Sequence, residues 1–128
     1  NLCSLKLIIQ PLVENAIKHG MEFMDGEGEI TIKTYIKDND LFIDVIDNGF
    51  GMTQENAERI LNGTLKTKSK GSGIGLKNVN ERIKICFGNN YGLSIFSELD
   101  EGTTVRIRMP YILVEEYLKN GDSKYEKK

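Results

Sequence analysis

An aspartate stands at an apolar position of a predicted strand, and its carboxylate is the first candidate for chemistry in this sequence. Asp47 follows Leu41, Ile43 and Val45 at every second residue, so these side chains share one side of the strand. A carboxylate buried there needs a partner, because an unpaired buried charge is costly. The partner is either an amino group of a ligand or a hydrogen bond within the protein. Taken alone, the segment Asp47–Gly49 is also typical of a simple turn.

Glycines recur at every second residue in front of the most regular predicted helix. Such glycines expose backbone N–H groups, and a helix N-terminus adds partial positive charge, so an anion could bind there. The pattern is neither the dinucleotide fingerprint nor a P-loop. A flexible hinge before a helix explains it about equally well. The segment is Gly71-Ser72-Gly73-Ile74-Gly75-Leu76, and the lysines that could reach phosphates from upstream are Lys66, Lys68 and Lys70.

A third group of polar residues lies at the end of the first predicted helix. Asn15 could give its amide oxygen to Mg²⁺, a cation that takes few protein ligands and keeps waters and phosphates. Glu14 and Lys18 are four residues apart, which also fits an ordinary helical ion pair. His19, the only histidine, could simply be a residue at the helix end. Each simple explanation is preferable alone, but the three groups together supply the parts of a nucleotide site.

The elements that must position these residues follow from hydrophobic periodicity. Apolar residues at helical spacing predict a first helix over 4–19, with a kink or a helix start near Pro11. Alternation predicts strands, and Thr103 adds a hydroxyl on the core-facing side of the last one. Helices and strands in this order predict an α+β layered fold. The remaining predicted elements are strands at 30–36 and 41–47, a helix at 53–61, a polar loop at 62–73, a helix at 75–87, and strands at 91–98 and 103–109.

Composition narrows the class of protein. The chain has 128 residues and a net charge of −2, which predicts one domain and argues against a nucleic-acid footprint or a polybasic membrane patch. Cys3 and Cys86 lie far apart, so we expect neither a disulfide framework nor a structural zinc site. No apolar run approaches the ~18 residues of a membrane span. Because the sequence begins at Asn1 rather than at Met, we expect a piece of a longer protein.

Four segments together resemble the motifs of sensor histidine kinases over roughly residues 5 to 110. Residues 10–20 resemble the N box, residues 47–52 the G1 box and residues 71–82 the G2 box. Residues 101–105 resemble the closing motif shared with gyrase-type ATPases. The wording of the N box, Gln-Pro-Leu-Val-Glu-Asn with a trailing His-Gly, is most similar to the LytS/YesM-type membrane sensor kinases.

This resemblance implies a Bergerat-type ATP-binding fold, a two-layer sandwich in which helices cover one face of a mixed β-sheet. Asp47 would accept a hydrogen bond from the adenine amino group with Thr103 beside it, and Asn15 would hold Mg²⁺ against the phosphates. Lys18 and His19 would line the phosphate path. The glycines would let the backbone pass the base or hinge the lid. The remaining ATP-binding positions implied are Gly49, Gly51, Met52, Lys68, Lys70, Gly71, Ser72, Gly73, Ile74, Gly75 and Leu76.

The resemblance also implies a reaction and partners. Gyrase-like members carry a water-activating carboxylate four residues before the metal-binding Asn, where this sequence has Pro11, so phosphoryl transfer to a protein is favoured over hydrolysis. Glu14 matches the kinase position that would assist the accepting histidine. That histidine would lie on an upstream dimerisation helix, and a response regulator would receive the phosphoryl group. Residues 1–112 would form the ATP-binding domain and 113–128 a charged tail.

The implied setting is a cytoplasmic domain of a membrane-bound homodimer. Two alternatives remain open at this point. The first is a serine kinase of the anti-sigma-factor type, which is similar in size and fold. The second is a nucleotide-binding interaction module without catalysis.

Overall fold

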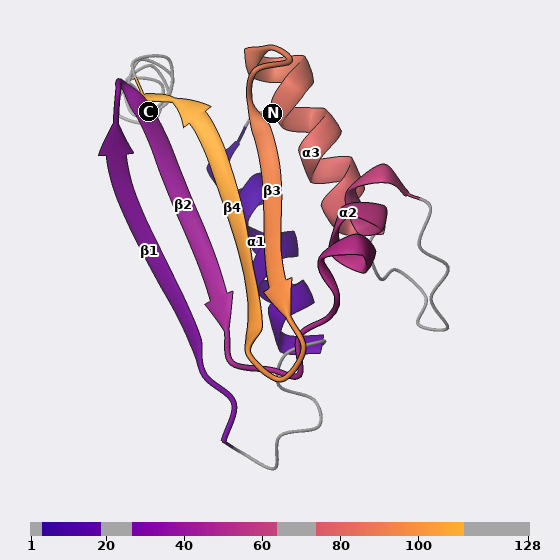
Figure 1. Cartoon of the computed structure of the whole chain (residues 1–128). Coiled ribbons are helices and arrows are strands. Elements are labelled where there is room, and N and C mark those ends of the chain that lie inside the picture. The colour runs from indigo at the N-terminus through magenta and orange to yellow at the C-terminus, as the bar shows by residue number, and fades with distance from the viewer. Residues whose placement is uncertain (1–3, 19–26, 64–73, 112–128) are drawn as a thin grey trace.

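The computed structural model describes residues 4–18, 27–63 and 74–111 of the chain, and these form a sheet with helices packed against it (Figure 1). Four antiparallel strands lie in the order β1-β2-β4-β3. Two hairpins therefore meet through β2 and β4, which carry the centre of the sheet. The elements are α1 (Leu5–Ala16), β1 (Ile30–Lys37), β2 (Asp40–Asp47), α2 (Gln54–Asn62), α3 (Ile74–Phe87), β3 (Gly92–Glu98) and β4 (Gly102–Pro110).

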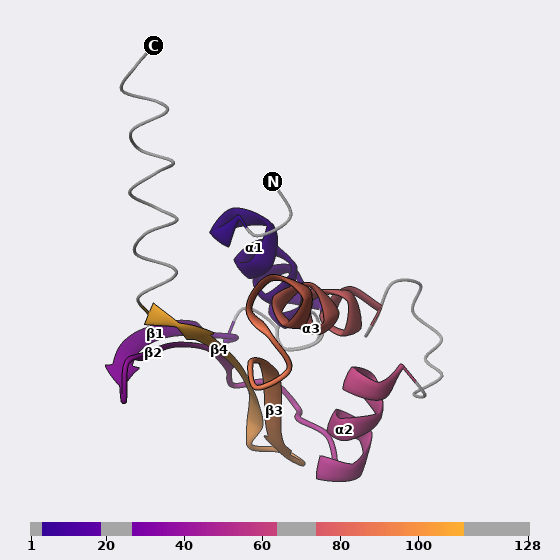
Figure 2. The same ribbon diagram turned by 90° about the horizontal axis from the view of Figure 1, so that it is seen from above.

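The α+β class is confirmed, with one difference in the sheet. The resemblance implied a mixed sheet. The described strands pair only antiparallel, so within this part of the chain the sheet is antiparallel instead. Pairing between hairpins is decided by contacts far apart in sequence, which periodicity does not report. Seen from above, α1 and α3 lie on one side of the sheet, while α2 packs beside β3 (Figure 2).

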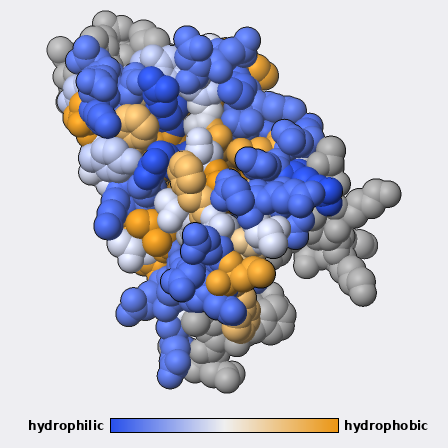
Figure 3. Space-filling view, in the orientation of Figure 1, coloured by the Kyte–Doolittle hydropathy of each residue, from blue (hydrophilic) through white to orange (hydrophobic). Residues whose placement is uncertain are grey.

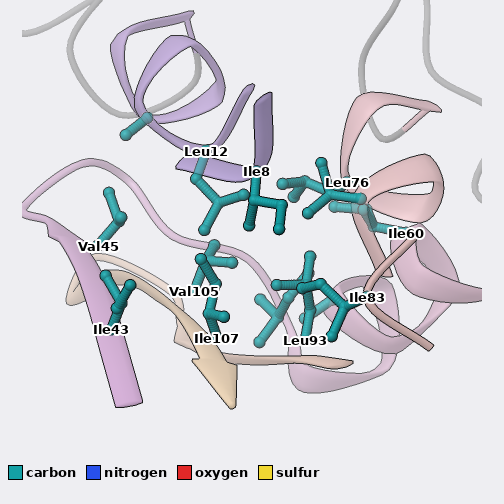
Figure 4. Packing of buried hydrophobic residues seen from close by; sticks show 14 of the residues in the cluster. Ile8, Leu12, Ile43, Val45, Ile60, Leu76, Ile83, Leu93, Val105 and Ile107 are labelled. Carbon is teal, nitrogen blue, oxygen red and sulfur yellow. The ribbon is translucent and has the colours of Figure 1, made fainter. Parts of the chain in front are cut away.

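The core lies between the helices and one face of the sheet, and it is built from alternating strand positions and the inner stripes of the helices (Figure 4). The side chains of Ile8 and Leu12 on α1 meet Val105 and Ile107 on β4, and none of these is more than 3% exposed. Leu76, Val79 and Ile83 provide the buried stripe of α3. This stripe and the buried residues of α1 fix which face each helix turns toward the sheet.

Pro11 lies inside α1 rather than at its start. A proline has no N–H to give to the carbonyl four residues earlier, here that of Leu7. The guanidinium of Arg82 on α3 donates to the Leu7 oxygen at 3.1 Å and takes the place of the missing donor. The helix therefore begins directly after Ser4, and a contact from another helix makes the proline tolerable.

Edge strand β1 departs from the buried pattern. Ile32 and Ile36 share a side with Val45 through the strand pairing, yet they are 51% and 54% exposed. The described helices do not cover this edge of the sheet. Ile17, placed on the apolar arc of the first helix by its spacing, is likewise half exposed just beyond the end of α1.

Cys86 on α3 is disulfide-bonded, a bond that the expectation of no disulfide framework did not anticipate. Separation along the sequence does not predict whether a cysteine can form a disulfide, because α1 and α3 pack together although they are far apart in the chain. Cys3 lies outside the described residues. Among the described helices, none is long and apolar enough to cross a membrane.

Candidate nucleotide-binding site

Three polar residues form a row across the sheet at the end where β2 finishes and β4 begins. Asp47 pairs with Thr103, and Thr103 pairs with Ser97 of β3, so the three side chains share the helix-covered face. Each is only 8% exposed. The inward position predicted for Asp47 is therefore confirmed. The row continues the same face that carries Val45, Val105 and the rest of the core.

The carboxylate of Asp47 is held by the turn that follows it. Its Oδ1 accepts a hydrogen bond from the Gly49 N–H at 2.9 Å, which is the geometry of an Asx turn. The next residue, Asn48, fastens the turn to the chain in front of β1, because its side chain bonds the Glu29 N–H at 2.7 Å and the Glu27 oxygen at 3.2 Å. The turn explanation is thus correct, and the turn also fixes the carboxylate at the sheet end.

Two glycines allow the backbone to close around Asp47. Gly102 has φ +95°, and a Cβ there would overlap the carbonyl oxygen of Asp47. Gly51 has φ +69°, and a Cβ there would overlap the carbonyl oxygen of Glu98. Any other residue would push the segment after β2 away from the β3–β4 turn. The predicted importance of Gly51 therefore has a steric reason in the fold.

The segment after β2 is also hydrogen-bonded to the β3–β4 turn. The Asp100 N–H donates to the Phe50 oxygen at 2.6 Å, and the Met52 N–H donates to the Ser97 hydroxyl at 2.9 Å. Ser97 in turn lies 2.8 Å from the hydroxyl of Thr103. The structure thus brings together Asp47, Gly49, Gly51, Met52 and Thr103, all of which the sequence proposed.

The last turn of α1 lies at the same end of the molecule as the end of β2 and the start of β4 (Figure 1). Asn15 is partly buried there, next to the core residue Ala16. Glu14 accepts a hydrogen bond from the Gln10 amide at 2.9 Å, rather than the lysine contact considered from spacing. Lys18 is exposed, and His19 lies outside the described residues.

The start of α3 packs against the middle of α1, because a Cβ on Gly75 would stand 4.0 Å from the Pro11 Cβ. The side chain of Leu76 is 1% exposed and belongs to the core, so only its backbone is left for a ligand. Ile74 opens the helix. The predicted phosphate-binding residues Lys68, Lys70, Gly71, Ser72 and Gly73 lie outside the described residues.

Sequence reasoning passed over two residues that support this site. Ser97 lies at the core-facing parity of β3 with Leu93 and Ile95, so the signal that revealed Asp47 was present there as well. Gln54 of α2 bonds the free edge of β3, donating to the Ile95 oxygen at 2.8 Å and accepting from the Ser97 N–H at 3.2 Å. Nothing in the local sequence of an exposed helix start indicates such a clamp.

Residues 3–112 match the family described as histidine kinase-, DNA gyrase B- and HSP90-like ATPases. The chain belongs to this family. The resemblance that the four motifs carried is thereby confirmed at the level of the family, and the described fold agrees with it.

Two of the similar curated proteins are sensor histidine kinases. Sensor histidine kinase YesM of Bacillus subtilis (strain 168) is 39% identical over 105 residues, 82% of this chain and 17% of that protein. Sensor histidine kinase YpdA of Escherichia coli (strain K12) is 38% identical over 110 residues, 86% of this chain and 18% of that protein. The chain therefore spans less than a fifth of the length of these curated relatives.

A solved structure gives the same fold. The catalytic domain of histidine kinase ThkA, in a nucleotide-free form, aligns with a TM-score of 0.67 at 22% identity. The alignment covers 84% of this chain and 66% of that one. At this identity the likeness shows the fold alone, and it agrees with the sheet and helices described above.

Proposed function

We propose that this chain is the catalytic domain of a two-component sensor histidine kinase, which binds Mg-ATP and donates its γ-phosphoryl group to a histidine outside the chain. The observation that supports this most directly is the buried pair Asp47 and Thr103 at the G1 position of an ATPase family. Two acceptor side chains there suit the amino group of adenine. The glycine-bounded turn around Asp47 lets the backbone pass close to a base.

Asn15 is the proposed metal ligand. The described residues hold no cluster of three His, Cys, Asp or Glu side chains that could hold a metal ion. A partly buried amide at the end of α1 fits Mg²⁺, because this cation takes one or two protein ligands and fills its remaining positions with phosphate oxygens and waters. The cation would neutralise phosphate charge. Lys18, His19, Lys68 and Lys70 would line the phosphates, with backbone N–H groups of Gly71–Leu76 beside them.

The role of the protein in this reaction is to position the γ-phosphoryl group and the accepting histidine. In the transfer, an imidazole nitrogen of the accepting histidine bonds to the γ-phosphorus, the bond to the β–γ bridging oxygen breaks, and ADP leaves. The protein contributes orientation and charge stabilisation rather than covalent steps. Glu14, exposed and held by Gln10, is the carboxylate proposed to assist the incoming imidazole.

The partners follow from the same proposal. They are the upstream dimerisation segment that carries the histidine, a response regulator, and a second copy of the longer protein. We propose a cytoplasmic location for this domain within a membrane-bound homodimer. Residues 1–112 would form the ATP-binding domain, and residues 113–128 a charged tail.

Titration calorimetry of this chain with ATP, with and without Mg²⁺, tests the nucleotide step. We expect tight binding only with Mg²⁺, and a loss of roughly tenfold or more in Asn15→Ala, the usual size for a metal-site residue. Asn62→Ala, at the exposed end of α2, is the matched control and should bind normally. Binding that ignores Mg²⁺ would favour the interaction module instead.

Transfer is tested with labelled ATP and a histidine-bearing dimerisation segment from a sensor kinase of this type. Acid-labile label on that segment supports the proposal, because phosphohistidine is acid-labile. Acid-stable label on an antagonist protein would identify a serine kinase and overturn it.

A further inference from the structure

The hydroxyl of Ser97 is the centre of a small buried network beside Asp47. Its Oγ accepts from the Met52 N–H at 2.9 Å and lies 2.9 Å from the Gly102 oxygen and 2.8 Å from the Thr103 Oγ1. Ser97 and Thr103 are each 8% exposed. No described buried side-chain oxygen or nitrogen lacks a hydrogen-bond partner. These contacts are close enough to fix where each proton lies.

Counting protons gives the direction of every bond. The Met52 N–H supplies its own proton, and the Gly102 carbonyl oxygen is an acceptor only. Ser97 has one hydroxyl proton, and the contact with Gly102 requires it. The proton in the contact between the two hydroxyls must therefore come from Thr103. This is the one assignment that places a proton in each of the three contacts.

The hydroxyl of Thr103 then has no proton left for a ligand. It keeps lone pairs, so it can only accept. Asp47, directly opposite on β2, presents a carboxylate that also accepts when ionised. Asp47 and Thr103, the two side chains that face the proposed base position, can therefore only accept hydrogen bonds from a ligand. A ligand carbonyl placed there would meet the lone pairs of both side chains.

We infer that Ser97 is a positioning residue for substrate choice: by taking the proton of Thr103, it makes the site select a purine with an amino group at position 6 over one with a carbonyl. This inference rests on the proposed function, in which Asp47 and Thr103 read the base. Sites built to hydrogen-bond a polar group reject analogues that leave that group unpaired. Without Ser97, the Thr103 hydroxyl is free to rotate and donate to a carbonyl.

The test compares ATP with inosine triphosphate, which carries a carbonyl at position 6, in calorimetric titrations with Mg²⁺. We expect Ser97→Ala to lower the preference for ATP roughly fivefold, the factor for one neutral hydrogen bond. Ser97→Thr keeps the hydroxyl and should restore the preference. In the background of Thr103→Val, the Ser97→Ala change should have no further effect on the preference, because it acts through Thr103.

The Ser97→Cys variant serves if Ser97→Ala does not fold, because sulfur fills the space but accepts only weakly. It should move the preference in the same direction by less. An unchanged preference in folded Ser97→Ala or Ser97→Cys, or equal weakening of both nucleotides in either variant, overturns the inference while ATP binding leaves the proposed function standing. Failure of the unmodified chain to bind ATP would overturn the proposed function itself and is a distinct result.

Discussion

Strand β2 buries aspartates on both of its faces, and the two faces hold the carboxylates in different ways. Asp40 and Asp44 lie on the side without helices, where each bonds an arginine of β4. Arg106 donates two hydrogen bonds to Asp44, at 2.9 and 3.2 Å, and this bonding to the carboxylate raises the pKa of the Arg106 guanidinium. Asp47 lies on the helix side, bonded by the backbone of its own turn and paired across the sheet with Thr103.

Aromatic rings complete the helix-free face. The guanidinium carbon of Arg106 lies 4.9 Å from the centre of the Phe96 ring, and that of Arg108 lies 5.9 Å from the centre of the Phe42 ring. Arginines and aromatic rings therefore cover Asp40 and Asp44 on a face that carries none of the described helices. Figure 3 shows this face, on which hydrophilic residues predominate and apolar side chains are scattered. Burial alone therefore does not identify a ligand-binding carboxylate. The groups that surround the carboxylate do.

The tight backbone around Asp47 gives the largest expected effect. Gly102→Ala would place a methyl group against the Asp47 oxygen at φ +95°, so we expect a loss of about 3 kcal/mol or more in the free energy of unfolding. Gly88→Ala is the matched control, because Gly88 also has a positive φ but nothing within 4 Å of its Cβ position. It should cost only the conformational strain, about 1–2 kcal/mol. Equal losses in chemical denaturation would show that the close approach is not rigid.

Exchanging the two kinds of aspartate for asparagine separates their roles. Asp47→Asn should weaken ATP binding about a hundredfold, or about 2.7 kcal/mol, because its amide presents a donor to the base amino group. The stability should change little, since the asparagine oxygen still accepts from Gly49. Asp44→Asn should keep its ATP affinity and lose about 1–2 kcal/mol of stability through the weakened pair with Arg106.

Calorimetry and thermal unfolding of both variants check this contrast. Asp38→Asn, at the β1–β2 turn far along β2 from Asp47, is a neutral control. A loss of ATP affinity in Asp44→Asn equal to that in Asp47→Asn would erase the distinction between the faces.

Residue type and the alternation of apolar and polar residues predicted those features that depend only on neighbouring residues in the sequence. The helix predicted from residue 53 begins as its first residue type favours, because Thr53 is the N-cap and its hydroxyl accepts from the Asn56 N–H. Asp47 stands out in the sequence because it is a charged residue at a strand position where the neighbours on the same side are apolar. Ser97 carried the same contradiction on β3, but a serine is a weaker signal than a carboxylate, and it was passed over.

What the sequence did not predict depends on contacts between distant segments. Arg82 supports the proline of α1 from another helix, and no local pattern pairs it with Leu7. Ile32 pairs with the core residue Val45 and shares its side of the sheet, but the exposure of Ile32 depends on where the helices lie over the sheet. The antiparallel meeting of the two hairpins has the same origin, because it is set by side-chain packing across the whole domain.

The edge of β3 offers a smaller test of how the hydroxyl row is supported. Gln54→Ala removes two hydrogen bonds to β3, including the one to the Ser97 N–H, and should cost about 2 kcal/mol in chemical denaturation. Glu58→Ala, exposed on the same helix, is the control for helix propensity and should be nearly neutral. Equal effects of the two changes would mean that the clamp contributes nothing to the sheet edge.

The smallest effect lies on the helix-free face, at Tyr91. Its hydroxyl donates to Asp40 at 3.2 Å. Burial, together with the charge and hydrogen bond of Asp40, raises the pKa of Tyr91 above its ordinary value of 10.0, against an opposing contribution from Arg108. The folded chain therefore keeps this proton at pH values where the unfolded chain has lost it. The stabilisation is complete below pH 10 and is lost as the pH rises through the folded pKa, because the folded state then binds more protons than the unfolded state.

Tyr91→Phe removes this titration together with the bond to Asp40. At neutral pH it should cost about 1 kcal/mol, the net value of one hydrogen bond. The difference in unfolding free energy between the two proteins should be constant from pH 7 to about 9 and should shrink as the pH rises above 10. Urea denaturation at each pH measures it. A difference that stays constant above pH 10 would mean that Tyr91 is not coupled to Asp40, and that the arginine of this face alone holds that carboxylate.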